Sequence, residues 1–184
     1  MKRKSAVTLL AVLFTAFIFN GCEKDDICAE GTPTTPSVIV EFYYLDNPST
    51  LRPLTNFRYY ALGNEKLLPE TDGIPPAVSR IELPLQTDGQ TTTWALVSSS
   101  PQTGGGYLYN TDFITFNYTT AQLYVSRACG YKSQFFLDNL NPVALTDNTE
   151  AGEYNTVMGL WIKDIIVANN TIENEDETHI KIYL

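Results

Sequence analysis

Short apolar runs separated by turn residues recur along most of the chain, and several of them alternate apolar and polar positions. Residues 37–45, for example, place Val38, Val40 and Phe42 on one face. Alternation with a period of two is typical of a β-strand with one buried face. The pattern predicts about eight strands, which we place at residues 37–45, 57–62, 78–85, 91–98, 112–119, 122–127 with a continuation at 131–137, 156–168 and 178–184.

The spacing of these runs predicts the fold class. No segment after residue 21 carries a convincing amphipathic helical pattern, and strands at this spacing with turn signals are typical of a sandwich or barrel. We expect an all-β, antiparallel, immunoglobulin-like β-sandwich, with a small lipocalin-like β-barrel as the alternative. Residues 156–168 are apolar on both faces, so we expect a central strand that is covered on both sides.

A different pattern marks the first residues of the chain. Lys2, Arg3 and Lys4 precede an apolar stretch at residues 6–19, which is shorter than the ~20 residues that cross a bilayer as a helix. This order is typical of a secretory signal peptide. A cysteine follows Gly21, as in the bacterial lipobox, so we expect cleavage before Cys22 and acylation of Cys22 by chains such as palmitate. An ordinary signal peptide with a chance cysteine is the alternative.

These features divide the chain into three parts. Residues 1–21 are the predicted lipoprotein signal peptide, and residues 22–36 are a tether without periodicity. Residues 37–184 form a single predicted domain, long enough to bury a sizeable core. The run from Glu23 to Asp26 resembles the lysine-plus-acidic tether of some Gram-negative surface lipoproteins. We therefore expect an outer-membrane anchor that faces the cell surface, with a periplasm-facing anchor as the alternative.

Charge narrows the classes of partner. The chain has 12 Lys and Arg and 21 Asp and Glu, with a formal net charge of −9. Removal of residues 1–21 takes three positive charges and lowers the net charge to −12. Nucleic acid and anionic lipid surfaces are therefore poor partners on electrostatic grounds. The membrane contact that we expect is the lipid on Cys22.

Three cysteines remain to be assigned. Cys22 takes the lipid, which leaves Cys28 and Cys129 as an even pair in an oxidising compartment, where disulfides persist. We expect a disulfide between them; two unpaired buried thiols are the alternative. A metal site is not expected, because zinc prefers cysteine and histidine at close spacing and the chain has one histidine, His179.

Two cysteine-centred motifs carry a resemblance to a known family. They are CxxDDICxEGTPTTP at residues 22–36 and VSRACGYK at residues 125–132. With them the chain resembles an uncharacterised family of small Gram-negative envelope lipoproteins, filed as a domain of unknown function. The resemblance implies an extracytoplasmic lipoprotein in which Cys28 and Cys129 are paired, and it implies no activity.

The chain offers few residues for catalysis. A Ser-His-Asp or Cys-His arrangement has to use His179, which we expect on a solvated strand face, and most carboxylates sit in turns. We therefore expect neither an enzyme nor a cofactor. The triplet at residues 104–106 is a flexible turn that could also bring Tyr107 and Tyr109 up to a ligand. The acidic turns do not match a calcium loop.

Two basic residues flank the second cysteine motif. Arg127 and Lys132 lie close to Cys129 in an acidic chain, and we count both as a candidate partner or ligand surface. If Cys28 and Cys129 are bridged, Arg127 is placed to pair with the acidic residues of the tether, which are Asp25, Asp26 and Glu30.

The functional expectation is a lipid-anchored, non-catalytic outer-membrane lipoprotein that serves as an accessory or binding subunit. Its expected partner is another envelope protein, such as an outer-membrane β-barrel. The alternative is a surface glycan-binding protein or a carboxylate-dependent glycoside hydrolase. The glycan alternative expects a row of exposed aromatic side chains beside carboxylates in a groove.

Overall fold

The computed structural model describes residues 27–28, 35–71 and 73–184. The predicted signal peptide, Cys22 and most of the tether lie outside the described residues. In the described part, no helix is long and apolar enough to cross a membrane. The described strands are β1 (Val38–Tyr43), β2 (Phe57–Ala61), β3 (Asn64–Leu68), β4 (Arg80–Leu83), β5 (Thr91–Pro101), β6 (Tyr107–Ser126), β7 (Gly130–Leu137), β8 (Val143–Asp147), β9 (Asp164–Val167), β10 (Thr171–Ile172) and β11 (Ile180–Tyr183).

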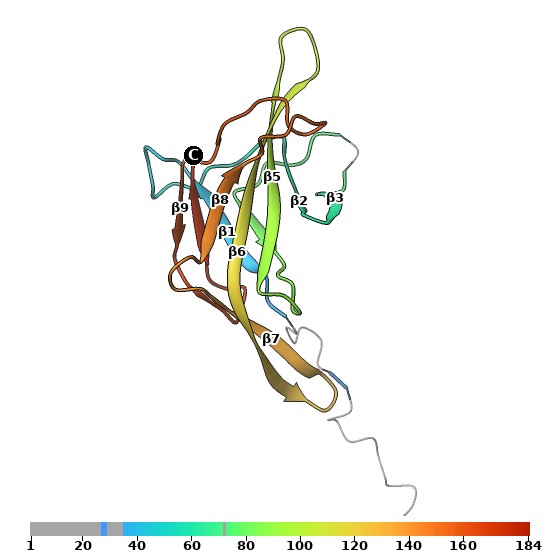
Figure 1. Ribbon diagram of the computed structural model, residues 1–184, viewed down its shortest axis with the longest axis vertical. Helices are drawn as coiled ribbons and strands as arrows, with labels where there is room; N and C mark the ends of the chain where they lie inside the picture. The colour runs from blue at the N-terminus through green and yellow to red at the C-terminus, as the bar shows by residue number, and fades with distance from the viewer. Residues whose placement is uncertain (1–26, 29–34, 72) are drawn as a thin grey trace, which may run out of the picture. The chain divides into compact units, whose positions relative to one another are not determined.

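The strands form two sheets (Figure 1). The four-stranded sheet has the order β4-β1-β11-β9, and β1 and β11 run parallel in it. The second sheet has the order β10-β7-β6-β5-β2-β3, with β8 paired to β6 as well. The other strand pairs given by register are antiparallel. The prediction of an all-β sandwich is confirmed, and the alternative of a closed small barrel is wrong.

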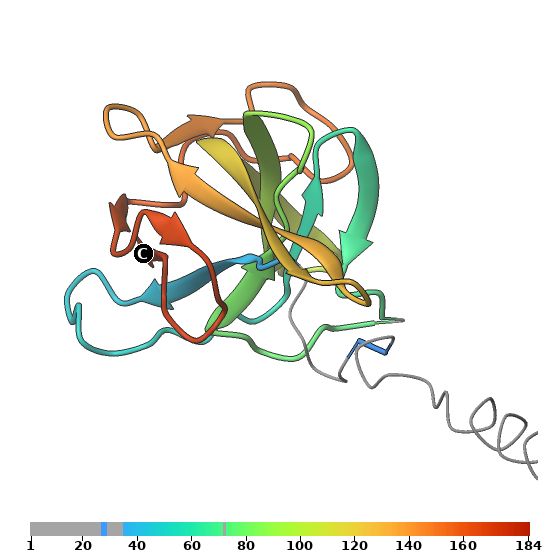
Figure 2. The ribbon, with the colours of Figure 1, turned by 90° about the horizontal axis from the view of Figure 1, so that it is seen from below.

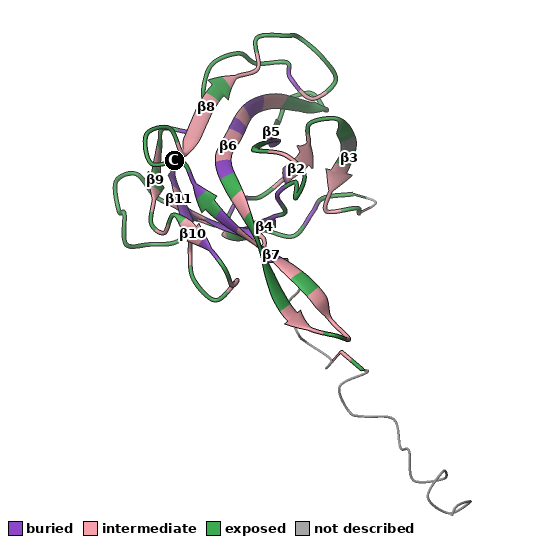
Figure 3. Ribbon diagram, turned by 60° about the horizontal axis from the view of Figure 1, so that its bottom comes forward, coloured by how far each residue is buried: buried purple, intermediate pink, exposed green. Residues whose placement is uncertain are grey.

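The core lies between the inward faces of the two sheets. Phe42 of β1 packs edge-on against Phe57 of β2, with the ring centroids 5.3 Å apart. Tyr118 of β6 contacts Phe135 of β7 in the same way, also at 5.3 Å. Along β6 every second residue from 112 to 118 is buried, which Figure 3 shows as alternating bands. Period-two alternation therefore places the core residues of β6 as the sequence predicts.

The strand boundaries differ from the prediction in three places. The described chain has eleven strands rather than about eight, because β3, β8 and β10 are short strands in segments that read as loops. β6 is one strand where the sequence suggested two. Residues 156–163 form no strand, and only β9 remains of the predicted central strand, at an edge of the four-stranded sheet. Many apolar residues in this segment are exposed, so its apolar character does not reflect burial.

His179 corrects a second expectation. It lies immediately before β11 and is buried rather than solvated. The backbone nitrogen of Ile39 donates to His179 Nδ1 at 2.9 Å, and the nitrogen of His179 donates to the carbonyl of Ile39 at 3.0 Å. Burial lowers the pKa of His179. The imidazole is a structural acceptor for the backbone of β1, which pairs with β11 in parallel. Figure 2 shows β1, in blue, beside the C-terminal end of the chain.

The described residues fall into two compact units. Residues 35–123 and 132–184 belong to the larger one, which holds both sheets and their core. Ile27, Cys28 and Tyr124–Tyr131 belong to the smaller one. In the smaller unit a disulfide joins Cys28 to Cys129, which are 101 positions apart in the chain. This is the cysteine pair that the sequence predicts.

Candidate functional site

The inward face of β6 contains polar residues where an apolar residue is expected. Asn110 and Asp112 share a face with Ile114, Phe116 and Tyr118, because side chains two apart on a strand point the same way. Asp112 is completely buried. Across the sheet, Asp112 pairs with Asp147 at the end of β8. Two carboxylates therefore lie directly opposite one another on neighbouring strands.

These side chains bind the backbone of the segment that follows β8. The nitrogens of Trp161 and Ile162 donate to Asp112 Oδ2 at 3.0 and 2.9 Å. The nitrogen of Gly159 donates to Asp147 Oδ2 at 2.8 Å, and Asn110 Nδ2 donates to the carbonyl of Gly159 at 2.8 Å. Oδ1 of each of these three side chains is buried without a protein partner. The other polar atom of each side chain thus holds residues 159–162 in place.

Asn155 fixes the other end of the same segment. It is buried, and its Oδ1 accepts a hydrogen bond from the nitrogen of Thr111 at 3.1 Å. Its Nδ2 donates to the carbonyls of Asn148 and Glu150 at 2.6 and 2.9 Å. The nitrogens of Thr156 and Val157 donate to the carbonyl of Tyr109. Residues 155–162 are therefore tied to β6 by side chains and backbone at both ends.

The segment presents apolar side chains to solvent. Val157, Met158 and Leu160 are exposed, and Met158 has 49% of its side-chain and backbone surface accessible. Gly159 has a φ of +101°, a conformation that glycine adopts without steric cost. We call Val157, Met158 and Leu160 the apolar loop face. Contiguous exposed apolar surface marks interaction sites, so these three neighbouring side chains make the segment a candidate binding surface.

Burial sets the protonation behaviour of the cluster. It raises the pKa of Asp112 to about 6, while the hydrogen bonds from Ile162 and Trp161 lower it. The charge of Asp147 raises it further, and Lys163 lowers it. Burial has the largest effect on the pKa of Asp112, because removing a carboxylate from water disfavours its charged form. Asp112 is thus neutral in part of the folded population under mildly acidic conditions.

Tyr107 and Tyr109 lie in a hollow of about 320 Å³ close to the same segment. The two rings are 6.3 Å apart, and Tyr154 packs edge-on against Tyr109 at 5.8 Å. Glycines 104–106 all have positive φ and form the turn that leads into β6. The hollow is lined by Asn56, Arg58, Gly73, Ile74, Pro75, Ser99, Tyr107 and Tyr109. The structure thus brings the two predicted tyrosines to one concave surface.

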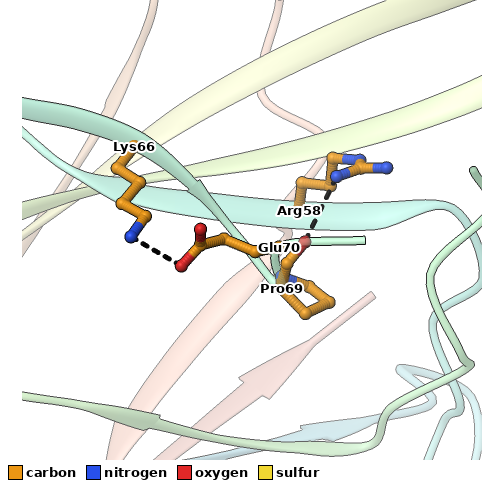
Figure 4. Close-up of polar contacts among 4 residues, drawn as sticks. All are labelled: Arg58, Lys66, Pro69 and Glu70. Atoms are coloured by element: carbon orange, nitrogen blue, oxygen red, sulfur yellow. Dashed lines mark hydrogen bonds and ion pairs between the residues drawn. The ribbon is translucent and has the colours of Figure 1, made fainter. Parts of the chain in front are cut away.

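Arg58 supplies the positive charge of this hollow, and its donors are largely used. Nη1 donates to the carbonyl of Pro69 at 3.2 Å, as Figure 4 shows. Nη2 donates to the carbonyls of Thr71 and Gly73. The neighbouring ion pair in Figure 4 joins Lys66 to Glu70 at 2.6 Å on the surface. Arg58 therefore fixes the loop that forms one wall of the hollow.

A second hollow, of about 530 Å³, is more polar. It contains Phe136, which is exposed, and Asp138, whose Oδ1 accepts hydrogen bonds from the nitrogens of Leu140 and Asn141. Tyr118 also borders it, but the ring is buried. Neither hollow combines a row of exposed aromatic side chains with carboxylates. The arrangement that the glycan alternative expects is therefore incomplete in both.

The two predicted basic residues lie in different units. Arg127 is exposed in the turn between β6 and β7, and Lys132 Nζ donates to the carbonyl of Glu173 at 3.3 Å. The acidic partners proposed for Arg127 are outside the described residues. In the described part of the chain, no group of three or more His, Cys, Asp and Glu residues could hold a metal ion.

Sequence reasoning missed Asn110, Asp112, Asp147 and Asn155. A usable signal existed for Asp112, because it falls in phase with Ile114 and Phe116 on a predicted strand. A carboxylate in phase with an apolar face is rarely left unpaired, since burying an isolated charge is costly. The other three residues follow only from the strand pairing, which no pattern in one sequence reveals.

Fold and site together define a class of protein. It is an all-β, two-sheet sandwich that presents exposed apolar side chains on a loop tied down by buried polar residues. The chain belongs to a family of unknown function, DUF6452, whose model matches residues 56–184. Of the two cysteine-centred motifs, the one at residues 22–36 lies before the matched region and the one at residues 125–132 lies within it. Searches of the curated proteins and of the solved structures found no match.

Proposed function

We propose that the mature protein is a non-catalytic lipoprotein, anchored in the outer membrane by acyl chains on Cys22 and facing the cell surface. It acts as an accessory subunit that binds another envelope protein, such as an outer-membrane β-barrel, through the apolar loop face. The observation that carries the binding role is the exposed apolar segment held rigidly over buried polar residues.

Pre-organisation is the physical argument for this role. A loop that is already ordered loses little conformational entropy when a partner covers it, so more of its contact energy appears as affinity. The hydrogen bonds that the side chains of Asp112 and Asn155 accept from backbone nitrogens supply that order. Methionine and leucine adapt well to a partner surface. A segment whose only task is to connect β8 with β9 does not need Val157, Met158 and Leu160 in solvent.

The test is a crosslinking experiment on the lipidated protein in membranes. A photo-crosslinking amino acid replaces Met158, and the complex is purified in mild detergent. We expect one crosslinked envelope protein in stoichiometric amount. Leu160→Asp should reduce its recovery at least tenfold, because an apolar contact is replaced by a charge that must be desolvated.

Matched controls separate binding from anchoring and folding. Leu140→Asp changes another exposed apolar residue, which is 97% accessible, and should leave recovery unchanged. Cys22→Ala should release the protein from the membrane and abolish the complex while the fold is retained. Recovery of the bare protein alone, from cells in which Cys22 is acylated, contradicts the accessory role.

The tyrosine hollow favours a second candidate function, the binding of a small ring-shaped ligand such as a sugar. Tyr107 and Tyr109 present aromatic surface on which a sugar ring can stack. We expect Tyr109→Ala to lower the affinity for a bound oligosaccharide about tenfold, measured by calorimetry against a panel of surface glycans. Tyr44→Ala, which removes an exposed tyrosine elsewhere, is the control. No heat of binding with any glycan contradicts this candidate.

A further inference from the structure

An exposed aromatic pair flanks the turn between β6 and β7. Tyr124 and Tyr131 meet edge-on with their ring centroids 5.4 Å apart. They are 54% and 64% exposed, so the pair is not part of a core. The nitrogen of Cys129 donates to Ser126 Oγ at 3.0 Å, which orders the turn between them. We call Tyr124–Tyr131 the hairpin tip.

The charge of the hairpin tip differs from that of the whole chain. Residues 113–137 contain Arg127 and Lys132 and no carboxylate, whereas the full chain has a net charge of −9. Within the hairpin tip the charged residue is Arg127, which is exposed. A guanidinium group recognises phosphate with two parallel hydrogen bonds. The hairpin tip is thus suited to a phosphate-bearing surface that the rest of the chain disfavours.

Chain length limits how far the hairpin tip can lie from the acyl anchor. Cys28 is joined to Cys129, and Cys22 precedes Cys28 by six positions. Six residues span at most about 20–22 Å when fully extended. The headgroup layer on each side of a bilayer is itself about 5–8 Å thick. Acyl chains on Cys22 therefore keep Cys129 within reach of the membrane surface.

We propose that the hairpin tip docks onto the lipid headgroups of the membrane that holds the acyl anchor. Tyr124 and Tyr131 occupy the interface between headgroups and acyl chains, and Arg127 binds a lipid phosphate. Tyrosine is enriched at this depth because its ring is apolar and its hydroxyl is polar. The inference rests on the proposed acylation of Cys22.

Weak contacts are sufficient for this docking. The anchor makes the second contact intramolecular, with an effective concentration in the millimolar range for a short linker. A hairpin tip whose isolated affinity for lipid is only millimolar is then docked for a large share of the time. The disulfide shortens the link between the two contacts, because it joins Cys28 of the tether to Cys129 in the hairpin tip.

The test uses the full acylated protein in vesicles of phosphatidylethanolamine and phosphatidylglycerol. Tyr124→Trp places a fluorophore in the hairpin tip, and half of the vesicles contain lipids brominated on their acyl chains. We expect bromine to quench the fluorescence of the Tyr124→Trp protein several-fold more than that of the wild-type protein, which contributes the background from its two native tryptophans. Equal quenching of the two proteins overturns the inference.

A charge series at position 127 supplies the matched controls. In the Tyr124→Trp background, Arg127→Glu should weaken the docking equilibrium about fivefold or more, because it removes one phosphate contact and adds repulsion. Arg127→Lys keeps the charge and should preserve most of the quenching. Quenching that persists unchanged in Arg127→Glu contradicts the phosphate contact.

Vesicle flotation separates this inference from the proposed function on which it rests. A protein that does not float with vesicles lacks the acyl anchor, and the proposed function fails. A protein that floats while the hairpin tip is not quenched retains the anchor, and only the docking inference fails. Crosslinking of the hairpin tip to another protein, in the absence of quenching, assigns it to a protein partner instead.

Discussion

Replacing Asp112 with asparagine is expected to raise the free energy of unfolding by about 1–2 kcal/mol at pH 8 and to leave it nearly unchanged at pH 4. The asparagine keeps an oxygen that accepts the hydrogen bonds from Trp161 and Ile162. Its amide takes the place of Asp112 Oδ1, which has no protein partner, and removes the charge that lies opposite Asp147 in the strand register. Chemical unfolding of both proteins across the pH range measures the effect.

The sign follows from the protonation of Asp112 in the two states. Burial raises the pKa of Asp112 from 3.8 to about 6 in the folded protein. The folded state therefore binds more protons than the unfolded state between these values, and its stability falls as pH rises. The stabilising contribution is fully present below pH 3.8 and is lost above about pH 6. Asparagine does not titrate. The free energy of unfolding of Asp112→Asn therefore rises above that of the wild type as the pH increases from 3.8 to about 6.

His179 contributes a pH dependence of the opposite sign. Its pKa is lowered by burial, so stability is lost as pH falls below the value of an exposed histidine. This contribution cancels when the free energies of unfolding of Asp112→Asn and the wild type are compared at the same pH, because both proteins contain His179. Asp112→Ala is the matched control, since it leaves one buried and one partly buried backbone donor without a partner and should cost about 2–4 kcal/mol. A gain for Asp112→Asn that is the same at pH 4 and pH 8 contradicts the assignment.

Removing the disulfide with Cys28→Ser and Cys129→Ser together is expected to lower the free energy of unfolding by about 2–4 kcal/mol. The bridge closes a loop of 101 positions, which restricts the unfolded chain far more than a short loop does. Guanidinium unfolding of the soluble chain, which begins at residue 23, measures the difference.

Reduction of the wild-type protein provides the internal control for this prediction. Its unfolding midpoint in dithiothreitol should fall to that of the double variant, and the double variant should not respond to the reductant. Limited proteolysis should cut near Cys28 faster in the variant, because the tether is no longer attached to the hairpin tip. An unfolding midpoint that is unchanged in the double variant shows that the bridge contributes no stability.

The strands with one buried face are the part of the fold that sequence reasoning predicts well. β4 and the 112–118 part of β6 alternate as expected because the packing of one face on a core imposes the period, whereas β1 and β5 contain runs of consecutive buried residues. Sequence reasoning did not predict β8, because its residues lie in a segment rich in Asn and Asp, where turn preferences dominate. Residues 156–163 were misassigned because apolar composition alone does not distinguish a buried strand from an exposed loop.

For the candidate site, too, sequence reasoning predicts some residues and misses others. Tyr107 and Tyr109 were predictable because a glycine turn precedes two aromatic residues on one strand face. The apolar loop face depends on Asp112 and Asn155, which act on residues distant in the chain. Their role comes from cross-strand register and loop closure, and local propensity carries no information about either.

The parallel pair of β1 and β11 has a consequence for the order of folding. Ile39 and His179 are 140 positions apart, and each is the hydrogen-bond partner of the other. The centre of the four-stranded sheet therefore cannot form until the ribosome has completed nearly all of the chain that separates them. Non-local pairing of this kind slows folding. The export that we propose for this chain would benefit from such a delay, since the first strand stays without its parallel partner during transit.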